Sequence, residues 1–502
     1  MNLFIKPGYR ARGTAVYFDD TAYADDDIIH QPHAYTLAGF LASRYHAETI
    51  IDIGCGSGRK LMGLQGIRRI GIDYGANLVH CKQLNPDETW VEADLESCRT
   101  LDIPPEVISR SVVLCADVIE HLVNPTNLLA LLSKLATRAR AVIITTPDRD
   151  LVRGIDDAGP PANAAHVREW NIEEFHSLLR ASDLAPTFIG LTINNNKKLE
   201  KKTILAVIDG CPLEQAHQVP NNFRPIALCA TYNDADIAPQ TVNALLDDQI
   251  DVWVLDNWSG DGTFEALESI ASVRSSLNVE RFPANGPSPH YEWSSILTKK
   301  QQLAATFPNR WVIHHDSDEV RASPWANVSL RAGLYLAQRM NFNAVDFTVC
   351  DFRPVESGFS PGVDPRVALR FFEFGRRPGH FKQVKAWLQG AEIVNLTESG
   401  GHDVQFNGRR IFPYKFLLKH YPLRSPDQAR RKVFQERLDR FSPEERASGL
   451  HTHYDRWNRD DPFLWSDAEL IHFDEHETRA SYLVELISGI GIDLLSVSTC
   501  AA

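Results

Sequence analysis

The sequence lacks most features that mark secreted or membrane-spanning proteins. Its eight cysteines are scattered, and none of them form a Cys-x-x-Cys pair. This spacing disfavours a disulfide framework or a thiolate zinc site and favours a reduced, cytoplasmic protein. No run of about 18 apolar residues is present, and residues 1–12 contain no stretch typical of a signal peptide. We therefore expect no transmembrane segment and leave peripheral membrane contact open.

Basic residues are also outnumbered by acidic residues. The chain has 52 Lys and Arg residues against 65 Asp and Glu residues, a formal net charge of -13. An acidic surface disfavours broad binding to nucleic acid, so we expect no nucleic-acid partner. The 502 residues, 43% of them hydrophobic, exclude a disordered or fibrous chain and suffice for two or three domains.

Two blocks of the chain share one order of elements, in which an apolar strand is followed by a Gly/Asp-rich turn and a helix. The first block opens with a strand at 49–53, and the second with a strand at 225–230. This alternation is typical of parallel sheets covered by helices, so we predict an α/β protein with two such domains. The predicted divisions are a first domain over 1–212, a linker over 213–222, a second domain over 223–456 and a C-terminal helical extension over 457–502.

The first block contains a candidate nucleotide pocket. Gly54, Gly56 and Gly58 lie between a buried strand and a helix, where missing side chains let a ligand approach the backbone N–H groups. Asp73 ends the next strand, a position from which a carboxylate can accept hydrogen bonds from both hydroxyls of a ribose. Asp94 follows a third short strand and is a candidate acceptor for an adenine amino group.

A fourth strand ends at Asp117, which faces the same predicted crevice. The segments 51–58 (Ile-Asp-Ile-Gly-Cys-Gly-Ser-Gly) and 117–122 (Asp-Val-Ile-Glu-His-Leu) resemble motifs of class I S-adenosylmethionine-dependent methyltransferases, across residues 30–210. A dinucleotide-binding domain is the weaker reading, because the expected fourth glycine is missing. The resemblance implies a Rossmann-like sheet, S-adenosylmethionine as cofactor, and a set of cofactor-binding residues: Asp52, Gly54, Gly56, Gly58, Asp73, Asp94 and Asp117.

Two histidines are candidates for the base that takes a proton from a hydroxyl acceptor. His121 borders the predicted cofactor site, and an imidazole titrates near neutral pH. His166 follows the Gly/Pro-rich segment 159–161, which has the composition of a loop over an acceptor. For both residues a structural or substrate-orienting role is an equal alternative.

The second block places carboxylates after successive strands. Thr231 and Asp234 follow its first strand and Asp256 ends its second, which suits contacts to a nucleobase or ribose. Asp316 and Asp318 follow its third strand. Two such carboxylates can hold Mg²⁺ or Mn²⁺, which neutralises the charge on a departing diphosphate.

In this order the motifs of the second block resemble a family 2 glycosyltransferase of GT-A fold, across residues 224–425. The resemblance implies inverting transfer from a nucleotide-sugar donor to a glycan or lipid-linked saccharide acceptor. It assigns Thr231, Asp234 and Asp256 to the nucleoside, Asp316 and Asp318 to a metal diphosphate as a DXD motif, and His420 as a third metal ligand.

Inversion also requires a general base, for which Asp351, Glu398 and Asp403 are candidates. We favour Asp403, because the two glycines near it permit close approach. The chain as a whole is predicted to be a bifunctional enzyme of surface polysaccharide biosynthesis. The alternative is a glycosyltransferase with a non-catalytic, methyltransferase-like docking domain.

Overall fold

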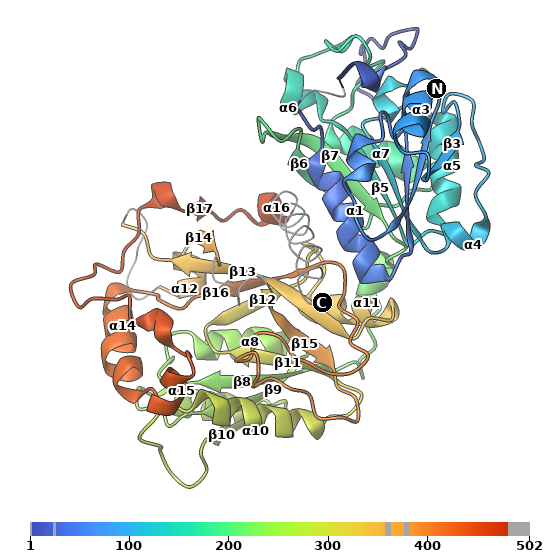
Figure 1. Ribbon diagram of the computed structural model, residues 1–502. Coiled ribbons are helices and arrows are strands. Elements are labelled where there is room, and N and C mark those ends of the chain that lie inside the picture. The colour runs from blue at the N-terminus through green and yellow to red at the C-terminus, as the bar shows by residue number, and fades with distance from the viewer. Residues whose placement is uncertain (1–2, 24–26, 357–362, 376–381, 480–502) are drawn as a thin grey trace. The chain divides into compact units, whose positions relative to one another are not determined.

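The computed structural model describes residues 3–23, 27–356, 363–375 and 382–479, and it divides into two compact units (Figure 1). The first unit runs to Leu213 and includes the described residues from His476 onward, whereas Glu214–Glu475 form the second. Both units are built from strands alternating with helices, so the α/β prediction is confirmed for each.

The first unit is built on a seven-stranded sheet of order β3-β2-β1-β4-β5-β7-β6. Strands β1 to β5 are parallel, whereas β7 runs antiparallel to β5 and to β6. The strand order reverses between β1 and β4, and ligands of such sheets bind beyond the carboxyl ends of the strands at that point. The bounds are β1 Thr49–Ile53, β2 Arg68–Asp73, β3 Thr89–Glu92, β4 Ser111–Ala116, β5 Ala141–Pro147, β6 Phe188–Ile193 and β7 Lys201–Ile208.

Helices cover this sheet because its central strands are buried along their length. The leucines of α5 (Thr126–Ala136) and the apolar face of α7 (Ile172–Ala181) pack into one core cluster with Ile51, Val113 and Val142. Helix α1 (Pro32–Tyr45) contacts β1, β4 and β5. The shorter elements are η1 Asp20–Tyr23, α2 Arg59–Met62, α3 Gly75–Leu84, α4 Pro105–Ile108, η2 Ile119–His121 and α6 Arg149–Arg153.

The second unit contains a ten-stranded sheet whose main path is β10-β9-β8-β11-β15-β13-β14-β17. Strands β8 to β11 are parallel, and β15 inserts antiparallel between β11 and β13. Off this path, β12 pairs with β16, which also pairs with β13. The bounds are β8 Ile226–Thr231, β9 Asp251–Asp256, β10 Leu277–Arg281, β11 Trp311–Asp316, β12 Glu319–Ala322, β13 Ala344–Arg353, β14 Phe371–Phe374, β15 Val384–Leu388, β16 Phe416–His420 and β17 Ile471–His472.

The helices of the second unit follow its strands as the sequence pattern indicates. They are α8 Ala238–Asp247, α9 Thr263–Ala271, α10 Trp293–Ala305, α11 Leu330–Arg339, α12 Pro365–Ala368, α14 Pro426–Arg431 and α15 Pro443–Ala447. The division between the units falls within α16 Glu475–Glu477. The 3₁₀ and π segments are η3 Leu213–His217, η4 Lys432–Arg437, η5 Leu438–Arg440, η6 Thr452–Tyr454 and η7 Asp467–Glu469.

The C-terminal part differs from the predicted helical extension over 457–502. Residues up to Glu475 belong to the second unit, where β17 pairs antiparallel with β14. Residues 480–502 lie outside the described part of the chain. Over the described ranges, the structure has no helix with the length and apolar character needed to cross a membrane.

Candidate functional site

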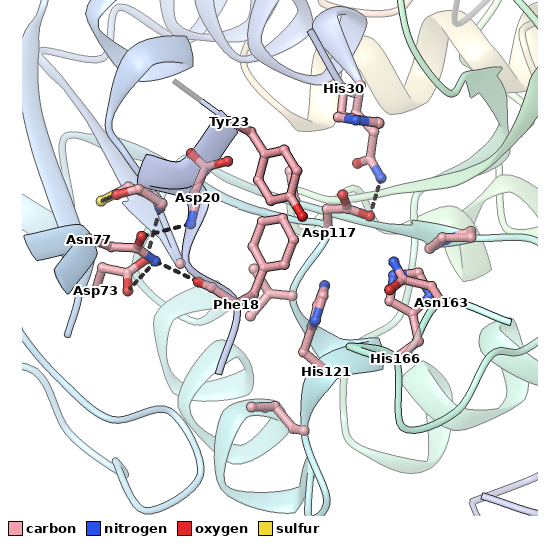
Figure 2. A pocket seen from close by; sticks show the side chains of 18 of the residues that line it. Phe18, Asp20, Tyr23, His30, Asp73, Asn77, Asp117, His121, Asn163 and His166 are labelled. Carbon is pink, nitrogen blue, oxygen red and sulfur yellow. Dashed lines mark hydrogen bonds between the residues drawn. The ribbon is translucent and has the colours of Figure 1, made fainter. Parts of the chain in front are cut away.

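A cavity of about 750 Å³ lies in the first unit at the carboxyl ends of its parallel strands (Figure 2). The predicted residues Gly54, Gly56, Asp73, Asp94 and Asp117 line it, together with both predicted histidines. The topology explains this gathering, because β1, β2, β3 and β4 all end at the same edge of the sheet.

The glycine turn and Asp73 are joined by a hydrogen bond. The Gly56 N–H donates to Asp73 Oδ2 at 2.8 Å, and Tyr74 N–H donates to Oδ1 at 2.8 Å. Gly56 has a φ of 55°, and a Cβ there would lie 2.6 Å from Asp20 Oδ2, so a larger residue would be strained and crowded. Burial raises the pKa of Asp73, against the effect of these N–H donors.

Residues from 15–23 and 28–31 complete the cavity, and sequence reasoning did not find them. Asp20 Oδ2 accepts a hydrogen bond from Ser57 N–H at 2.7 Å, and Asp20 N–H donates to Asn77 Oδ1 at 3.0 Å. Gln31 Nε2 donates to Asp117 Oδ1 at 2.8 Å. These residues precede the first predicted strand and carry no motif, so only the folded chain reveals them.

Asp117 and the short η2 turn form the floor of the cavity beside the histidines. Burial would raise the pKa of Asp117, but Glu120, His121 and Lys60 lower it to about 2. Burial and the charge of Asp117 raise the pKa of Glu120 well above its ordinary value. Burial lowers the pKa of His121 to about 4. His121 is therefore neutral near pH 7 and a weaker base than an ordinary imidazole.

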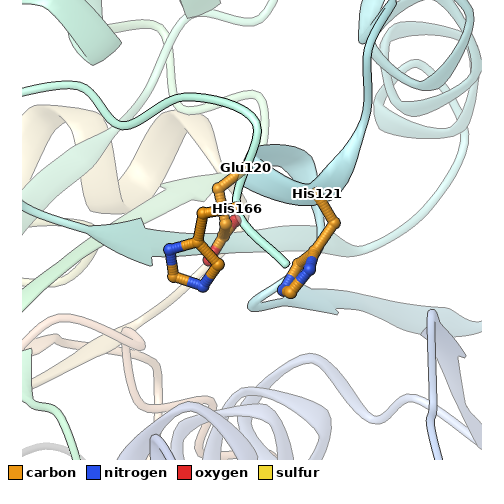
Figure 3. A group of neighbouring side chains, drawn as sticks. All are labelled: Glu120, His121 and His166. Atoms are coloured by element: carbon orange, nitrogen blue, oxygen red, sulfur yellow. The ribbon is translucent and has the colours of Figure 1, made fainter. Parts of the chain in front are cut away.

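The two histidines lie against each other, with ring centroids 4.8 Å apart (Figure 3). His121 Nδ1 lies 3.2 Å from the carbonyl oxygen of Ala165, and His166 Nδ1 lies 2.6 Å from Glu169 Oε1. Both rings are thus oriented by acceptors on the segment that precedes α7.

Two predicted cofactor-binding residues do not line this cavity, and the prediction for them is corrected. Asp52 is fully buried within β1, where Tyr35 Oη donates to its Oδ2 at 2.9 Å, and burial raises its pKa to about 7. Gly58 faces Trp90, whose ring would lie 2.9 Å from an added Cβ.

The second unit has its own cavity of about 840 Å³, again beyond the carboxyl ends of parallel strands. Six predicted residues line it: Thr231, Asp234, Asp316, Asp318, Glu398 and His420. Basic side chains share the lining: Arg353, Lys385, Lys432, Arg437 and Arg456.

The two carboxylates of the predicted Asp-x-Asp pair line the same cavity and have different lysine partners. Asp316 ends β11 and lies 3.6 Å from Lys300 Nζ and 3.8 Å from Lys385 Nζ. Asp318 follows in a turn and contacts Lys432 Nζ at 2.8 Å and His420 Nε2 at 3.7 Å. Burial would raise the pKa of Asp318, but Lys432 and His420 hold it well below its usual range.

His420 is supported from behind by Asp351, whose Oδ1 lies 2.7 Å from Nδ1. Burial would lower the pKa of His420, but Asp351 and Asp318 raise it. Asp351 itself lies outside the cavity lining, so its structural role is to orient His420. The prediction of Asp351 as a base is therefore corrected.

Asp256 and Asp403 also lie outside the residues that line the second cavity. The carboxylate of Asp256 accepts hydrogen bonds from the backbone and hydroxyl of Ser259, which close the turn after β9. Asp403 forms ion pairs with Lys382 and Arg409, which hold it beside the sheet. Of the three predicted bases, Glu398 lines the cavity.

Comparison with known proteins assigns the first unit. A family model described as a methyltransferase domain matches residues 32–187. The ubiquinone biosynthesis O-methyltransferase of Photobacterium profundum is 23% identical over 183 residues, covering 36% of this chain and 69% of that relative. The relative of the same name in Pseudomonas syringae pv. tomato is 26% identical over 106 residues, covering 20% of this chain and 46% of that relative.

Two solved structures are also similar, at low sequence identity. The methyltransferase domain of bacterial CtHen1 is 20% identical, with a TM-score of 0.26, covering 36% of this chain and 98% of that one. Magnesium protoporphyrin IX methyltransferase (ChlM) from Synechocystis PCC 6803, solved with bound SAH, is 17% identical, with a TM-score of 0.26. The match covers 38% of this chain and 95% of that one. With the sheet order and the family match together, the N-terminal part of this chain is a class I S-adenosylmethionine-dependent methyltransferase domain.

Proposed function

We propose that the first unit transfers a methyl group from S-adenosylmethionine to a hydroxyl oxygen of a saccharide acceptor. The observation that carries this proposal is the pairing of Asp73 with the Gly56 N–H at the mouth of the cavity. That carboxylate is placed to accept hydrogen bonds from the ribose hydroxyls, and Asp94 lines the same cavity. The naming of two relatives as O-methyltransferases favours oxygen as the acceptor atom.

The reaction is an in-line displacement in which the methyl C–S bond breaks, a C–O bond forms and the acceptor hydroxyl loses its proton. Asp73, Asp117 and Asp20 face the cavity and accept hydrogen bonds from backbone or amide N–H groups. Because those donors are neutral, the acids keep negative charge in the cavity, which suits a cationic sulfonium. His121 and His166 are the side chains best placed to contact the acceptor hydroxyl.

Transfer of tritiated methyl from S-adenosylmethionine into a cell-glycan extract tests this function. The wild-type chain is expected to label glycan, and Asp73→Ala to lose the label because the ribose contact is removed. Val79→Ala, on the exposed side of α3, is a matched control that should label like wild type. Labelling that survives Asp73→Ala would contradict the proposed cofactor site.

For the second unit we propose glycosyl transfer from a nucleotide sugar to a glycan or lipid-linked saccharide. The arrangement that favours it is the placement of His420 between two carboxylates, those of Asp318 and Asp351. Lys432 and Lys385 line the same cavity as Asp318 and His420. Asp318 and His420 offer an oxygen and a nitrogen to Mn²⁺ or Mg²⁺, whereas Asp316 pairs with lysines. The basic side chains suit a diphosphate, and Glu398 is the proposed base.

Titration calorimetry with Mn²⁺ and a panel of nucleotide sugars tests the second function. One nucleotide sugar is expected to bind, and Asp318→Asn or His420→Asn to weaken its binding in the presence of Mn²⁺. Asp467→Asn, in η7 away from the cavity lining, serves as the control. Failure of every donor to bind would contradict a glycosyltransferase role.

A bifunctional chain would methylate and extend one surface polysaccharide precursor, an inference that depends on the two units sharing one chain. The alternative is a glycosyltransferase whose methyltransferase domain only docks to a partner. Binding of S-adenosylmethionine without methyl transfer to any glycan, alongside active glycosyl transfer, would favour that alternative. A cytoplasmic location remains a prediction from cysteine usage.

A further inference from the structure

One wall of the second cavity carries a buried histidine with an unused ring nitrogen. His314 lies on β11, lines the cavity and is only 1% exposed. Its Nε2 has no hydrogen-bond partner among the residues that the structure describes. A buried polar atom without a partner is unfavourable, and a ligand bound in the cavity is one way to satisfy it.

Lys300 determines which nitrogen of His314 carries the proton. The lysine side chain is fully buried on α10, and its Nζ lies 3.1 Å from His314 Nδ1. The same Nζ donates to the carbonyl oxygen of His315 at 2.8 Å and lies 3.6 Å from Asp316 Oδ1. Because an ammonium group only donates, His314 Nδ1 accepts and the proton is on Nε2. The unused atom is therefore a neutral N–H donor.

Aromatic rings continue the same wall. Trp293, the first residue of α10, and Tyr291 both line the cavity, with ring centroids 6.2 Å apart and ring planes 13° from parallel. The Trp293 and His314 ring centroids are 5.8 Å apart. Trp293 Nε1 donates to the carbonyl oxygen of Gly400 at 2.9 Å, which holds the indole ring in place. The wall thus combines an apolar ring surface with one N–H donor.

The segment 397–402 adds a carboxylate to this wall. Glu398, the proposed base, lies in this segment and lines the cavity. Gly401 has a φ of 90°, and a Cβ there would lie 2.8 Å from His314 Nε2. Because glycine has no side chain, the segment packs directly against the histidine. The indole ring, the N–H donor and the carboxylate therefore belong to one continuous region of the cavity.

We propose that this region is the saccharide-acceptor subsite of the second unit, an assignment that rests on the proposed glycosyl transfer. A sugar ring has an apolar C–H face, which suits the surface of Trp293. Its hydroxyl groups both donate and accept hydrogen bonds. One hydroxyl accepts from the Nε2–H group of His314, and the reacting hydroxyl lies at Glu398. A neutral N–H group near a carboxylate suits a hydroxyl better than a phosphate, which the basic side chains of the cavity attract instead.

Nitrogen NMR of the histidine rings in the full-length protein tests the subsite, with a panel of neutral methyl glycosides as probes. The signals of His314 are assigned by their absence from the spectrum of His314→Asn. In the wild type these signals should show a proton on Nε2, and at least one glycoside should shift them.

Titration calorimetry with that glycoside compares variants of His314. Asparagine places its amide near the Nδ1 position, so His314→Asn keeps an acceptor for Lys300 and loses the donor at Nε2. We expect about 10-fold weaker binding, as for the loss of one hydrogen bond. Glutamine places its amide near Nε2, so His314→Gln should retain most of the affinity. His217→Asn, exposed in η3 and outside the cavity lining, is the matched histidine control.

Trp293→Leu tests the apolar part of the subsite. Loss of the indole surface should also weaken glycoside binding by about 10-fold. This variant provides the answer if His314→Asn does not fold. Nucleotide-sugar affinity should stay within about 2-fold of wild type in His314→Asn, because the donor binds elsewhere in the cavity.

Absence of glycoside binding in the wild type, or a proton on Nδ1 of His314, would overturn the proposal. Equal glycoside affinity in wild type, His314→Asn and Trp293→Leu would also overturn it, as would a loss of nucleotide-sugar affinity in His314→Asn. Glycoside binding without glycosyl transfer would keep the subsite and reject the proposed function. Nucleotide-sugar binding without glycoside binding would keep that function and reject the subsite.

Discussion

The two cavities both lie beyond the carboxyl ends of parallel strands, yet their acidic residues have different partners. In the first unit, Asp73 is bound by backbone N–H groups and Asp117 by the amide of Gln31. In the second unit, Asp318 is paired with Lys432, and Asp234 with Arg424. The same residue type at the same kind of strand end therefore has a different electrostatic effect in each.

The difference indicates which ligand each cavity suits. Carboxylates bound by neutral donors leave net negative charge for a cationic ligand such as a sulfonium. In the second cavity the carboxylates share the lining with lysine and arginine, and this mixed lining suits a diphosphate better than a cation. Strand-end acids alone thus locate the two candidate pockets, and the partners of these acids indicate the charge of the ligand that each pocket suits.

The largest expected effect concerns Asp52 in the first unit, an acid buried without an ion pair. Its folded-state pKa of about 7 lies above its ordinary value of 3.8, so folding favours its protonated form. Its contribution to stability is fully present below pH 3.8 and is lost as pH rises through 7. By linkage the loss amounts to about 4 kcal/mol.

Hydrogen exchange of the β1 and β4 amides measures that stability at each pH. Asp52→Asn should remove most of the pH dependence between pH 4 and 8. An unchanged slope in the variant would show that Asp52 is not the group responsible.

Removing a cation from the second unit is expected to have the next largest effect. Arg424 donates to Asp234 at 2.8 Å, and both side chains are nearly fully buried. Arg424→Met leaves Asp234 without its charge partner, and breaking a buried pair in this way costs about 3 kcal/mol. Chemical denaturation followed by hydrogen exchange in β8 measures the loss.

The matched change in the first unit is Gln31→Leu, which removes the neutral donor to Asp117. The acceptor is an ionised carboxylate, so this hydrogen bond is worth about 2 kcal/mol, which is less than the loss expected for Arg424→Met. Equal losses in the two variants would contradict the contrast between neutral and cationic partners.

Cofactor affinity is expected to change by a smaller amount. Asp73→Ala removes two charge-assisted hydrogen bonds to a ribose, so S-adenosylhomocysteine should bind about 100-fold more weakly. Titration calorimetry measures this affinity. Nucleotide-sugar binding by the second unit should not change, and a loss there would indicate a general folding defect.

The smallest effect is expected at Asp403. Its carboxylate is paired with Lys382 and Arg409 outside the second cavity. Under the proposed glycosyl transfer, Asp403→Asn should alter the rate less than about 2-fold, whereas Glu398→Gln should abolish most of the activity. A large loss in Asp403→Asn would restore Asp403 as the base.

Much of this architecture could be predicted from the sequence, because strand periodicity and glycine turns are local signals. The strands ending at Asp73, Asp256 and Asp316 lie where the pattern predicts. Parallel order then brings Asp73, Asp94 and Asp117 to one edge without further information.

Side-chain direction and long-range partners could not be predicted in this way. The turn after β11 sends Asp316 and Asp318 to different lysines, although their spacing indicated a shared ion. Asp20 and Gln31 reach the first cavity from a segment without any motif.

The most direct test of the two-cavity account is hydrogen exchange of the full-length protein with and without S-adenosylmethionine. The account predicts protection at residues 54–58, 73–77 and 117–121, with no change at residues 316–320. Absence of protection at the glycine turn, or protection at residues 316–320 instead, would contradict it.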